Sequence, residues 1–260
     1  MNIVDITCTL KLRSIRTSVK ELSIVLIILF VFTVNTSSQP SLLSFAETGQ
    51  NNIYNGGYFS CSLSPGCEFG KNNVEGGMLF SFGGEREKNL AAFSLLGEHR
   101  FIFLQQSFNI TGLYLWKPFS SELRETNWGI VLNLELSHFR FSLGNNYRTY
   151  RFSREYIRLN EDIADNSRIV EPLNLIYTFQ YNLKKREEKW NLMFSVTNCD
   201  YFIIEQETNP MVIFKGCYQI NDNIQSFIDI GYKGVGFFNI KVDRFGYFLR
   251  LGMKWNIGKG

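Results

Sequence analysis

The sequence predicts an all-β fold: one antiparallel up-and-down meander of long strands that closes into a single barrel. Three observations predict it. Beyond residue 73, apolar side chains recur at every second position, which is the period of a strand with two different faces. Several alternating segments run well beyond the usual strand length of about five or six residues. The connections between them are alternately tight and long, as in a meander with turns on one side and loops on the other.

Residues 1–38 are expected to form a secretory signal peptide that takes no part in the fold. Basic residues precede the apolar run 22–34 and small polar residues follow it, which is the layout of such a leader. The run is shorter than the roughly 20 residues that a membrane-spanning helix needs, and an uncleaved signal anchor is the alternative. Without the leader, the formal net charge falls from +3 to +1.

Residues 39–73 allow two interpretations. The stretch from Gly57 to Phe69 has the pattern of a strand, but a single extra strand fits poorly into a barrel built from hairpins. One interpretation pairs it with residues 43–54, which gives twelve strands. The alternative is an N-terminal extension that lies outside the barrel or plugs it.

The barrel is assigned to residues 74–260, with about ten strands and with eight or twelve as alternatives. Each strand is assigned by its alternation: Trp128, Ile130 and Leu132, for example, share one face of the fourth. Tight turns are expected near residues 98, 137, 184–188 and 221–223, and the other connections are on average longer. In chain order the expected strands are 74–83, 89–97, 99–117, 126–137, 138–152, 170–183, 189–204, 209–220, 224–239 and 244–257.

The aromatic residues indicate that the apolar face of the barrel meets lipid. They make up 15% of the chain and fall on the apolar faces of the strands. The tryptophans lie at strand ends, and indole rings prefer the headgroup level of a membrane. With an even strand count, two would lie at each interface. The expected membrane-interface residues are Trp116, Trp128, Trp190 and Trp255.

The polar faces of the same strands carry charges of both signs. The lumen of a barrel this small is largely filled by side chains, so charges inside it must be paired or hydrated. The expected lumen-facing residues are Glu135, Arg140, Lys215, Asp229, Arg250 and Lys254.

In this pattern the chain resembles the bacterial outer-membrane β-barrel proteins. The shared features are the leader, the long alternating strands, the unequal connections and the aromatic-rich last strand GYFLRLGMKWNI. The resemblance covers roughly residues 74–260 and points to no particular family. It implies an outer-membrane location, contact with outer-membrane lipid and a monomeric barrel. Such barrels often end on an aromatic residue, whereas this chain continues through Gly258, Lys259 and Gly260.

Four cysteines follow the leader, and two of them are candidates for a disulfide. Cys199 and Cys217 stand at equal distances from a turn centred near Thr208, so a simple hairpin register places them opposite each other on the lumen side. An exported chain permits the bond. Free thiols are the alternative.

The longest loop combines arginines with aromatic residues in the stretch RTYRFSREYIR. Such a patch suits phosphate, anionic glycans or lipid headgroups. The alternative is a solvated loop whose arginines are neutralised by the acidic residues that follow. The candidate binding residues are Arg148, Arg151, Arg154, Arg158, Tyr150 and Tyr156.

Together these features favour an integral outer-membrane barrel with a structural, surface-binding or narrow solute-passage role. A soluble secreted β-barrel that binds a small apolar ligand and an outer-membrane lipid-modifying enzyme are the alternatives. No catalytic residue, metal site or cofactor is expected, because the chain has 2 histidines and no Cys-x-x-Cys or phosphate-binding glycine loop. The small net charge argues against nucleic acid as a partner and leaves small solutes or extracellular ligands.

Overall fold

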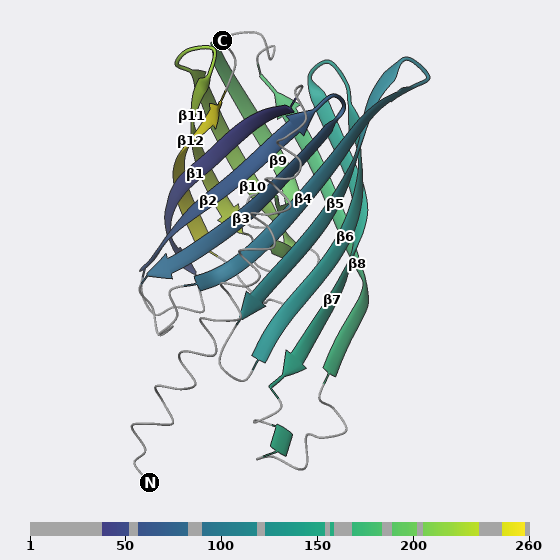
Figure 1. The fold of residues 1–260 in the computed structure, drawn as a ribbon, viewed down its shortest axis with the longest axis vertical. Coiled ribbons are helices and arrows are strands. Elements are labelled where there is room, and N and C mark those ends of the chain that lie inside the picture. Colours follow the sequence, from purple (N-terminus) through teal and green to yellow (C-terminus); the bar gives the residue numbers. More distant parts are fainter. Residues whose placement is uncertain are drawn as a thin grey trace.

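The protein is a closed antiparallel barrel, and the computed structural model describes residues 38–51, 57–82, 90–118, 123–153, 157–158, 168–183, 189–201, 205–233 and 246–257. Within these residues twelve strands pair with their neighbours in sequence, and the last pairs with the first (Figure 1). They are β1 Ser38–Asn51, β2 Gly57–Phe69, β3 Asn72–Phe82, β4 Leu90–Phe103, β5 Gln106–Pro118, β6 Leu123–Glu135, β7 Phe139–Phe152, β8 Arg168–Asn182, β9 Trp190–Asp200, β10 Glu205–Gln219, β11 Ile224–Lys233 and β12 Gly246–Asn256.

The predicted all-β meander is confirmed, with the twelve strands of the alternative rather than the expected ten. The two further strands come from the segment whose role was open. β1 pairs with β2 on one side and with β12 on the other, so this segment closes the barrel. The expected leader lies outside the described residues. No helix in the described part of the chain is long and apolar enough to cross a membrane.

The turns show where the strand boundaries were misplaced. Those at 136–138 and 221–223 lie as expected, whereas the turn expected near residue 98 is wrong. Gly97 lies inside β4, opposite Val74 and Gly112. The chain reverses instead at Leu104 and Gln105, whose φ angles are 50° and 62°. Hairpin turns of this kind are usually marked by Asn or Gly, and neither is present there.

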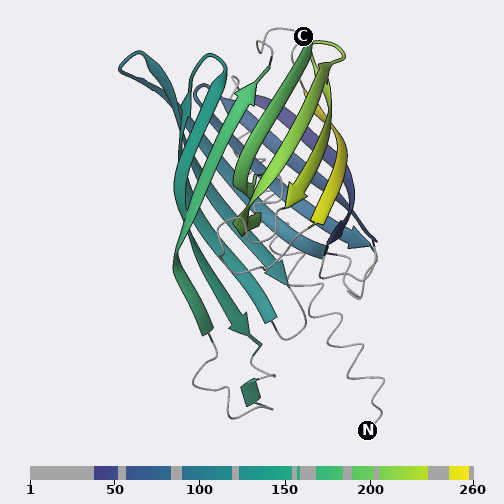
Figure 2. The same cartoon turned by 180° about the vertical axis from the view of Figure 1, so that it is seen from behind.

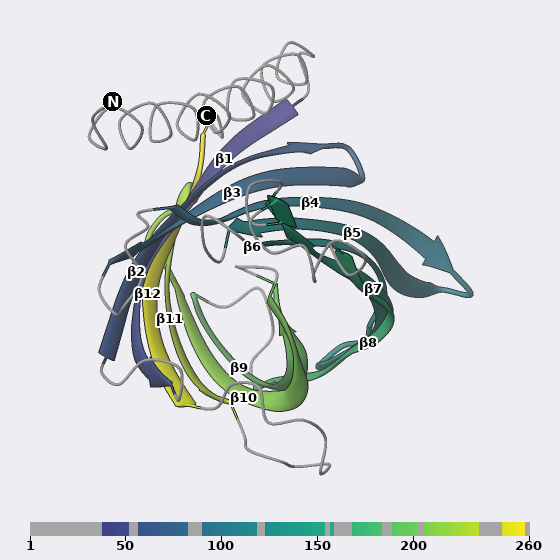
Figure 3. The ribbon, with the colours of Figure 1, turned by 90° about the horizontal axis from the view of Figure 1, so that it is seen from below.

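The barrel wall is apolar outside and polar inside. Leu132, Leu143 and Leu251 are exposed on the outer face, while polar and charged residues are buried in the lumen, among them Thr111, Asn133, Asp229 and Arg250. A soluble barrel has the opposite polarity. Viewed end-on, the strands surround one lumen, and the β4–β5 hairpin projects sideways from the ring (Figure 3).

One hairpin departs from the wall. The β8–β9 ladder runs only from Asn182↔Met193 to Thr178↔Thr197, and β8 continues past the end of β9 (Figure 2). Residues 197–200 are all buried, which breaks the alternation of the rest of β9. The β9–β10 ladder also jumps from Gln206 to Met211. We call residues 197–201 and 205–211 the inner tip.

Candidate functional site

The inner tip spans the lumen from one wall to the other. On one side, the Asp200 carboxylate accepts a hydrogen bond from the Arg250 guanidinium of β12, with 2.6 Å between Oδ2 and Nη2. On the other side, Cys199 and Tyr201 pack against an apolar cluster contributed by β4, β5, β6 and β8, namely Ala92, Leu113, Leu115, Val131 and Ile176. The tip therefore occupies the lumen between these walls.

Side-chain hydrogen bonds hold the tip where strand pairing ends. The Asn198 side chain donates to the carbonyl oxygen of Leu175 at 2.7 Å and accepts from the amide of Tyr177 at 2.8 Å. It thus takes the place of a neighbouring strand for two backbone groups of β8. Buried backbone groups need such partners. Asn198 therefore keeps these two groups of β8 hydrogen-bonded where β9 leaves the wall.

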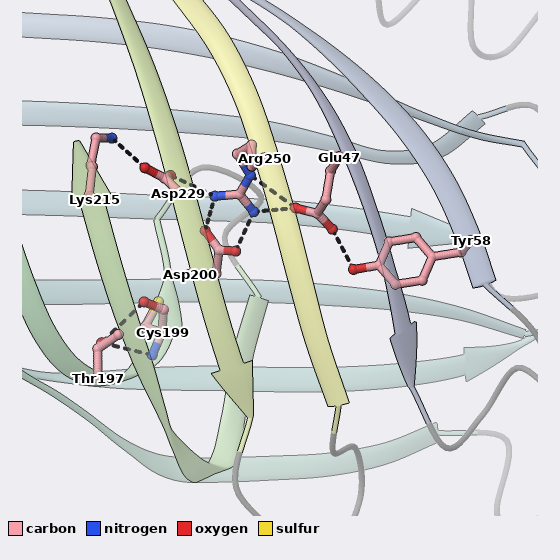
Figure 4. A network of polar contacts seen from close by, with 8 residues as sticks. All are labelled: Glu47, Tyr58, Thr197, Cys199, Asp200, Lys215, Asp229 and Arg250. Atoms are coloured by element: carbon pink, nitrogen blue, oxygen red, sulfur yellow. Dashed lines mark hydrogen bonds and ion pairs between the residues drawn. The ribbon is translucent and has the colours of Figure 1, made fainter. Parts of the chain in front are cut away.

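A row of charged residues runs across four neighbouring strands beneath Asp200. Strand register places Glu47 opposite Arg250, Arg250 opposite Asp229, and Asp229 opposite Lys215. Their charges alternate in sign along the row, and adjacent members form ion pairs (Figure 4). The distances are 2.9 Å from Arg250 Nε to Glu47 Oε2, 3.5 Å from Arg250 Nη1 to Asp229 Oδ2, and 3.6 Å from Lys215 Nζ to Asp229 Oδ1.

Arg250 is the centre of this cluster. Its side chain is 1% exposed, and its guanidinium lies between the rings of Phe45 and Phe248, at 4.7 Å and 4.9 Å from their centroids. The Tyr58 hydroxyl donates to the free oxygen of Glu47 at 2.7 Å. A buried charge is costly unless it is paired and hydrogen-bonded, and the planar guanidinium can serve several carboxylates and two aromatic faces at once.

A cavity of about 800 Å³ lies on the tight-turn side of the inner tip. Asp200, Tyr201 and Arg250 line its inner end, and Ser137 and Asn221 line the end at the turns. Its remaining walls carry amides, hydroxyls and charges of both signs, together with apolar side chains. We call this cavity the vestibule. Its lining is mixed, and it extends from the mouth of the barrel to the inner tip.

A second ion cluster lies in the lumen toward the long-loop end. Arg148 Nε is 3.2 Å from Glu125 Oε1, and Arg148 Nη1 is 3.6 Å from Glu171 Oε2. Asn127 donates to the same Glu125 oxygen at 2.7 Å. Arg148 is therefore tied to neighbouring strands inside the barrel.

This placement corrects the prediction of a basic-aromatic outer loop. Arg148, Tyr150 and Arg151 belong to β7, because the strand continues to Phe152. Arg158 falls in the short helical segment 157–158, and Arg154 and Tyr156 lie outside the described residues. Within β7 the alternation separates two of them: Arg148 faces the lumen, whereas Arg151 is exposed on the outer face.

The six charged residues expected in the lumen are all on its side of the wall. Glu135, Arg140, Lys215, Asp229 and Arg250 line the vestibule. Glu135 is opposite Arg140 in register, and the Arg140 guanidinium lies 6.0 Å from the centroid of the Tyr201 ring. Lys254 shares the inner face of β12 with Arg250, since four residues separate them.

Two central members of the site were missed. Glu47 lies in the segment 39–73, which had two interpretations. Asp200 was not singled out in the sequence, and β9 leaves the wall after Thr197 and carries Asp200 into the lumen. Strict alternation along the strand would put this carboxylate on the lipid side, where an unpaired charge is costly, and that was the available signal.

The tryptophans lie in two groups along the barrel. Trp190 begins β9 and Trp255 lies near the end of β12, both at the tight-turn end and both about half exposed. Trp116 and Trp128 lie toward the long-loop end of β5 and β6, and the Trp128 ring packs on Tyr114 at 4.5 Å. Their membrane-interface role stays a prediction.

The predicted proximity of Cys199 and Cys217 is wrong. Cys199 is opposite Gln206 and Cys217 is opposite Asn191, and all four described cysteines are free thiols. The reason is the turn: β10 begins at Glu205, so the hairpin reverses several residues before Thr208. An early turn and the bulge after Gln206 shift the whole register.

The two histidines contact asparagine residues. His99 Nδ1 is 2.8 Å from the side-chain oxygen of Asn72, and His138 Nδ1 is 3.1 Å from the backbone oxygen of Asn182. Neither of these two contacts joins a histidine to a serine.

Comparison with known proteins finds likeness in fold. No family model matches the chain, and no curated protein matches it. The KdgM porin, solved in complex with disordered oligogalacturonate, is similar with a TM-score of 0.49 and 10% identity over 83% of this chain and 98% of that one. The NanC porin gives 0.45 and 11%, over 82% and 98%. Outer membrane phospholipase A from Escherichia coli gives 0.42 and 9%, over 84% and 92%.

Because these identities and TM-scores are low, the class of membrane protein follows from the structure of the chain itself. The strands form a closed barrel, the outer face is apolar and polar residues are buried in the lumen, and even-numbered antiparallel closure with unequal connections is the construction of bacterial outer-membrane barrels. The chain is therefore an integral outer-membrane β-barrel protein.

Proposed function

We propose that the protein passes small polar solutes through its lumen and that the inner tip gates this passage. The observation that carries the proposal is the vestibule, a cavity of about 800 Å³ lined by charged, polar and apolar side chains that reaches from the tight-turn mouth to the tip. Such a space admits a small hydrated solute, and the tip stands between it and the long-loop end. Displacement of the tip would join the two halves of the lumen.

The attachment of the tip suits a gate. The wall strands share long backbone ladders, whereas the end of the tip is held by the Asp200–Arg250 ion pair, the Asn198 side chain and packing of Cys199 and Tyr201. These contacts can break without unpairing the wall. Segments with few backbone ladder bonds open locally at lower cost than the global fold.

The charges that line the vestibule suit neutral or zwitterionic solutes. Acidic residues such as Glu98 and Asp229 are interleaved with Arg140, Lys215 and other basic residues. Selectivity in a pore follows the charges at its narrow part. With both signs in near balance, we expect weak selectivity between small cations and anions.

Conductance across planar bilayers tests the proposal. The substitution Asp200→Asn keeps the size of the side chain and removes its charge from the Arg250 pair. We expect the native protein to show brief openings and the variant to remain open for a fraction of time about tenfold larger, which corresponds to about 1.4 kcal/mol. Liposome swelling in a zwitterionic amino acid should increase in parallel.

Glu68→Gln is the matched control, because Glu68 is half exposed and its ion pair with Arg100 lies at the tight-turn end. It should leave the openings unchanged. Heat-modifiable migration shows that each variant has folded. A folded native protein and a folded Asp200→Asn variant that both lack conductance and swelling would overturn solute passage. Equal open fractions in the two would overturn the gating role of the tip.

A further inference from the structure

We propose that a row of arginines on the outer face binds the phosphate groups of outer-leaflet lipid. Strand register places Arg124 of β6 opposite Arg151 of β7. The two positions lie side by side on neighbouring strands near the long-loop end of the barrel. We call them the arginine row.

The arginine row lies just beyond an aromatic belt. Tyr114, Trp128 and Tyr147 are paired across β5, β6 and β7, and Trp128 is 60% exposed on the outer face. Arg124 precedes Trp128 by four residues in β6 and therefore lies closer to the long-loop end. Four residues of a strand tilted by about 40° rise about 10 Å along the membrane normal. Since Trp and Tyr mark the membrane interface, the arginine row reaches the level of lipid phosphates.

The register of the arginine row favours the binding of an anion, because it places positive charges directly opposite each other. Like charges directly opposite each other on paired strands repel, and neighbouring strands are only about 4.8 Å apart. Arg124 and Arg151 are both exposed, and neither has an ion pair with any residue that the structure describes. Arg148 of the same strand shows the contrast, because it faces the lumen and is paired with Glu125 and Glu171.

A phosphate group removes this repulsion. Two guanidinium groups on adjacent strands can share the oxygens of one phosphate, and such charge-assisted, bidentate hydrogen bonds are the strong ones. Arg124 and Arg151, directly opposite each other, offer one such place. The lipid that fits is one with phosphate monoesters close to its acyl chains, which is the chemistry of the phosphorylated glycolipid of the outer leaflet.

Titration of the detergent-solubilised full chain with lipid A tests the proposal, with bound lipid counted by native mass spectrometry. The bisphosphorylated lipid should bind at least tenfold more tightly than the dephosphorylated one. The double substitution Arg124→Gln and Arg151→Gln should abolish this difference. Arg100→Gln is the matched control, because Arg100 is exposed at the opposite rim, and it should retain the difference in full.

Two further arms separate the other readings. Inorganic phosphate at the same concentration should not compete, since the acyl chains supply the membrane part of the binding; full competition would show a site for free phosphate and overturn the lipid assignment. The double substitution Arg124→Lys and Arg151→Lys should recover part of the preference, because it keeps the charges and loses the planar guanidinium forks. A preference that survives in the folded double Gln variant overturns the proposal.

Discussion

The wall of the barrel and its inner tip are built from the same alternating chain but are held in different ways. Between β5 and β6 the ladder is unbroken from Ser107↔Glu135 to Pro118↔Arg124. At the tip, the β8–β9 ladder ends at Thr178↔Thr197, and side chains make the remaining attachments. The wall depends on backbone pairing, which any sequence of the right period can form, whereas the tip depends on particular side chains.

This difference indicates where individual side chains matter most. The residues of the wall alternate between lipid and lumen, so each has one environment. The residues 197–200 are buried whichever way they point, and they bring a carboxylate to a guanidinium three strands away. The largest effects of substitution are therefore expected where the tip meets the wall, and they should decrease away from that contact.

Arg250→Met should have the largest effect. The substitution removes the one guanidinium shared by Glu47, Asp200 and Asp229, and it leaves buried carboxylates without their partner. We expect a loss of about 3–5 kcal/mol in the free energy of unfolding, measured by urea titration in micelles. A loss below about 1 kcal/mol would show that the cluster is hydrated and that the tip is not held by it.

Asn198→Ala should have an intermediate effect. It removes two hydrogen bonds that replace the missing strand beside Leu175 and Tyr177. Leaving such groups unsatisfied costs about 1–3 kcal/mol. Hydrogen exchange at the Tyr177 amide should accelerate accordingly.

The pattern of exchange provides the control for Asn198→Ala. Backbone amides of the β5–β6 ladder should keep the exchange rates of the native protein, because their partners lie in the wall. If hydrogen exchange accelerates to the same extent at the Tyr177 amide and in the β5–β6 ladder, the tip and the wall unfold as one unit, and the distinction between them fails.

The same distinction explains how much the sequence could predict. Alternation predicted β3–β12, whereas β1 and β2 were only one of two interpretations of residues 39–73. The lumen positions of Lys215, Asp229 and Arg250 follow from strand parity. The turn at Leu104 could not be found, because it has no Asn or Gly to mark it. The Cys199–Cys217 prediction was wrong and the lumen position of Asp200 was missed, because both depend on the point where β9 leaves the wall. That point is set by tertiary contacts of Asn198 and Asp200. Such contacts leave no periodic pattern in the sequence from which they could be predicted.

Arg100→Gln should have the smallest effect, and it sharpens the comparison because Arg100 is also an ion-paired arginine. Its Nη1 atom lies 3.5 Å from Glu68 Oε1, but the side chains are 47% and 46% exposed. Water screens such a pair, so its loss should cost about 0–1 kcal/mol, measured by the same urea titration as for Arg250→Met. A cost equal to that of Arg250→Met would mean that burial makes no difference to these ion pairs. The expected gap of several kcal/mol would instead assign the stability of the tip to the buried, aromatic surroundings of Arg250 rather than to ion pairing as such.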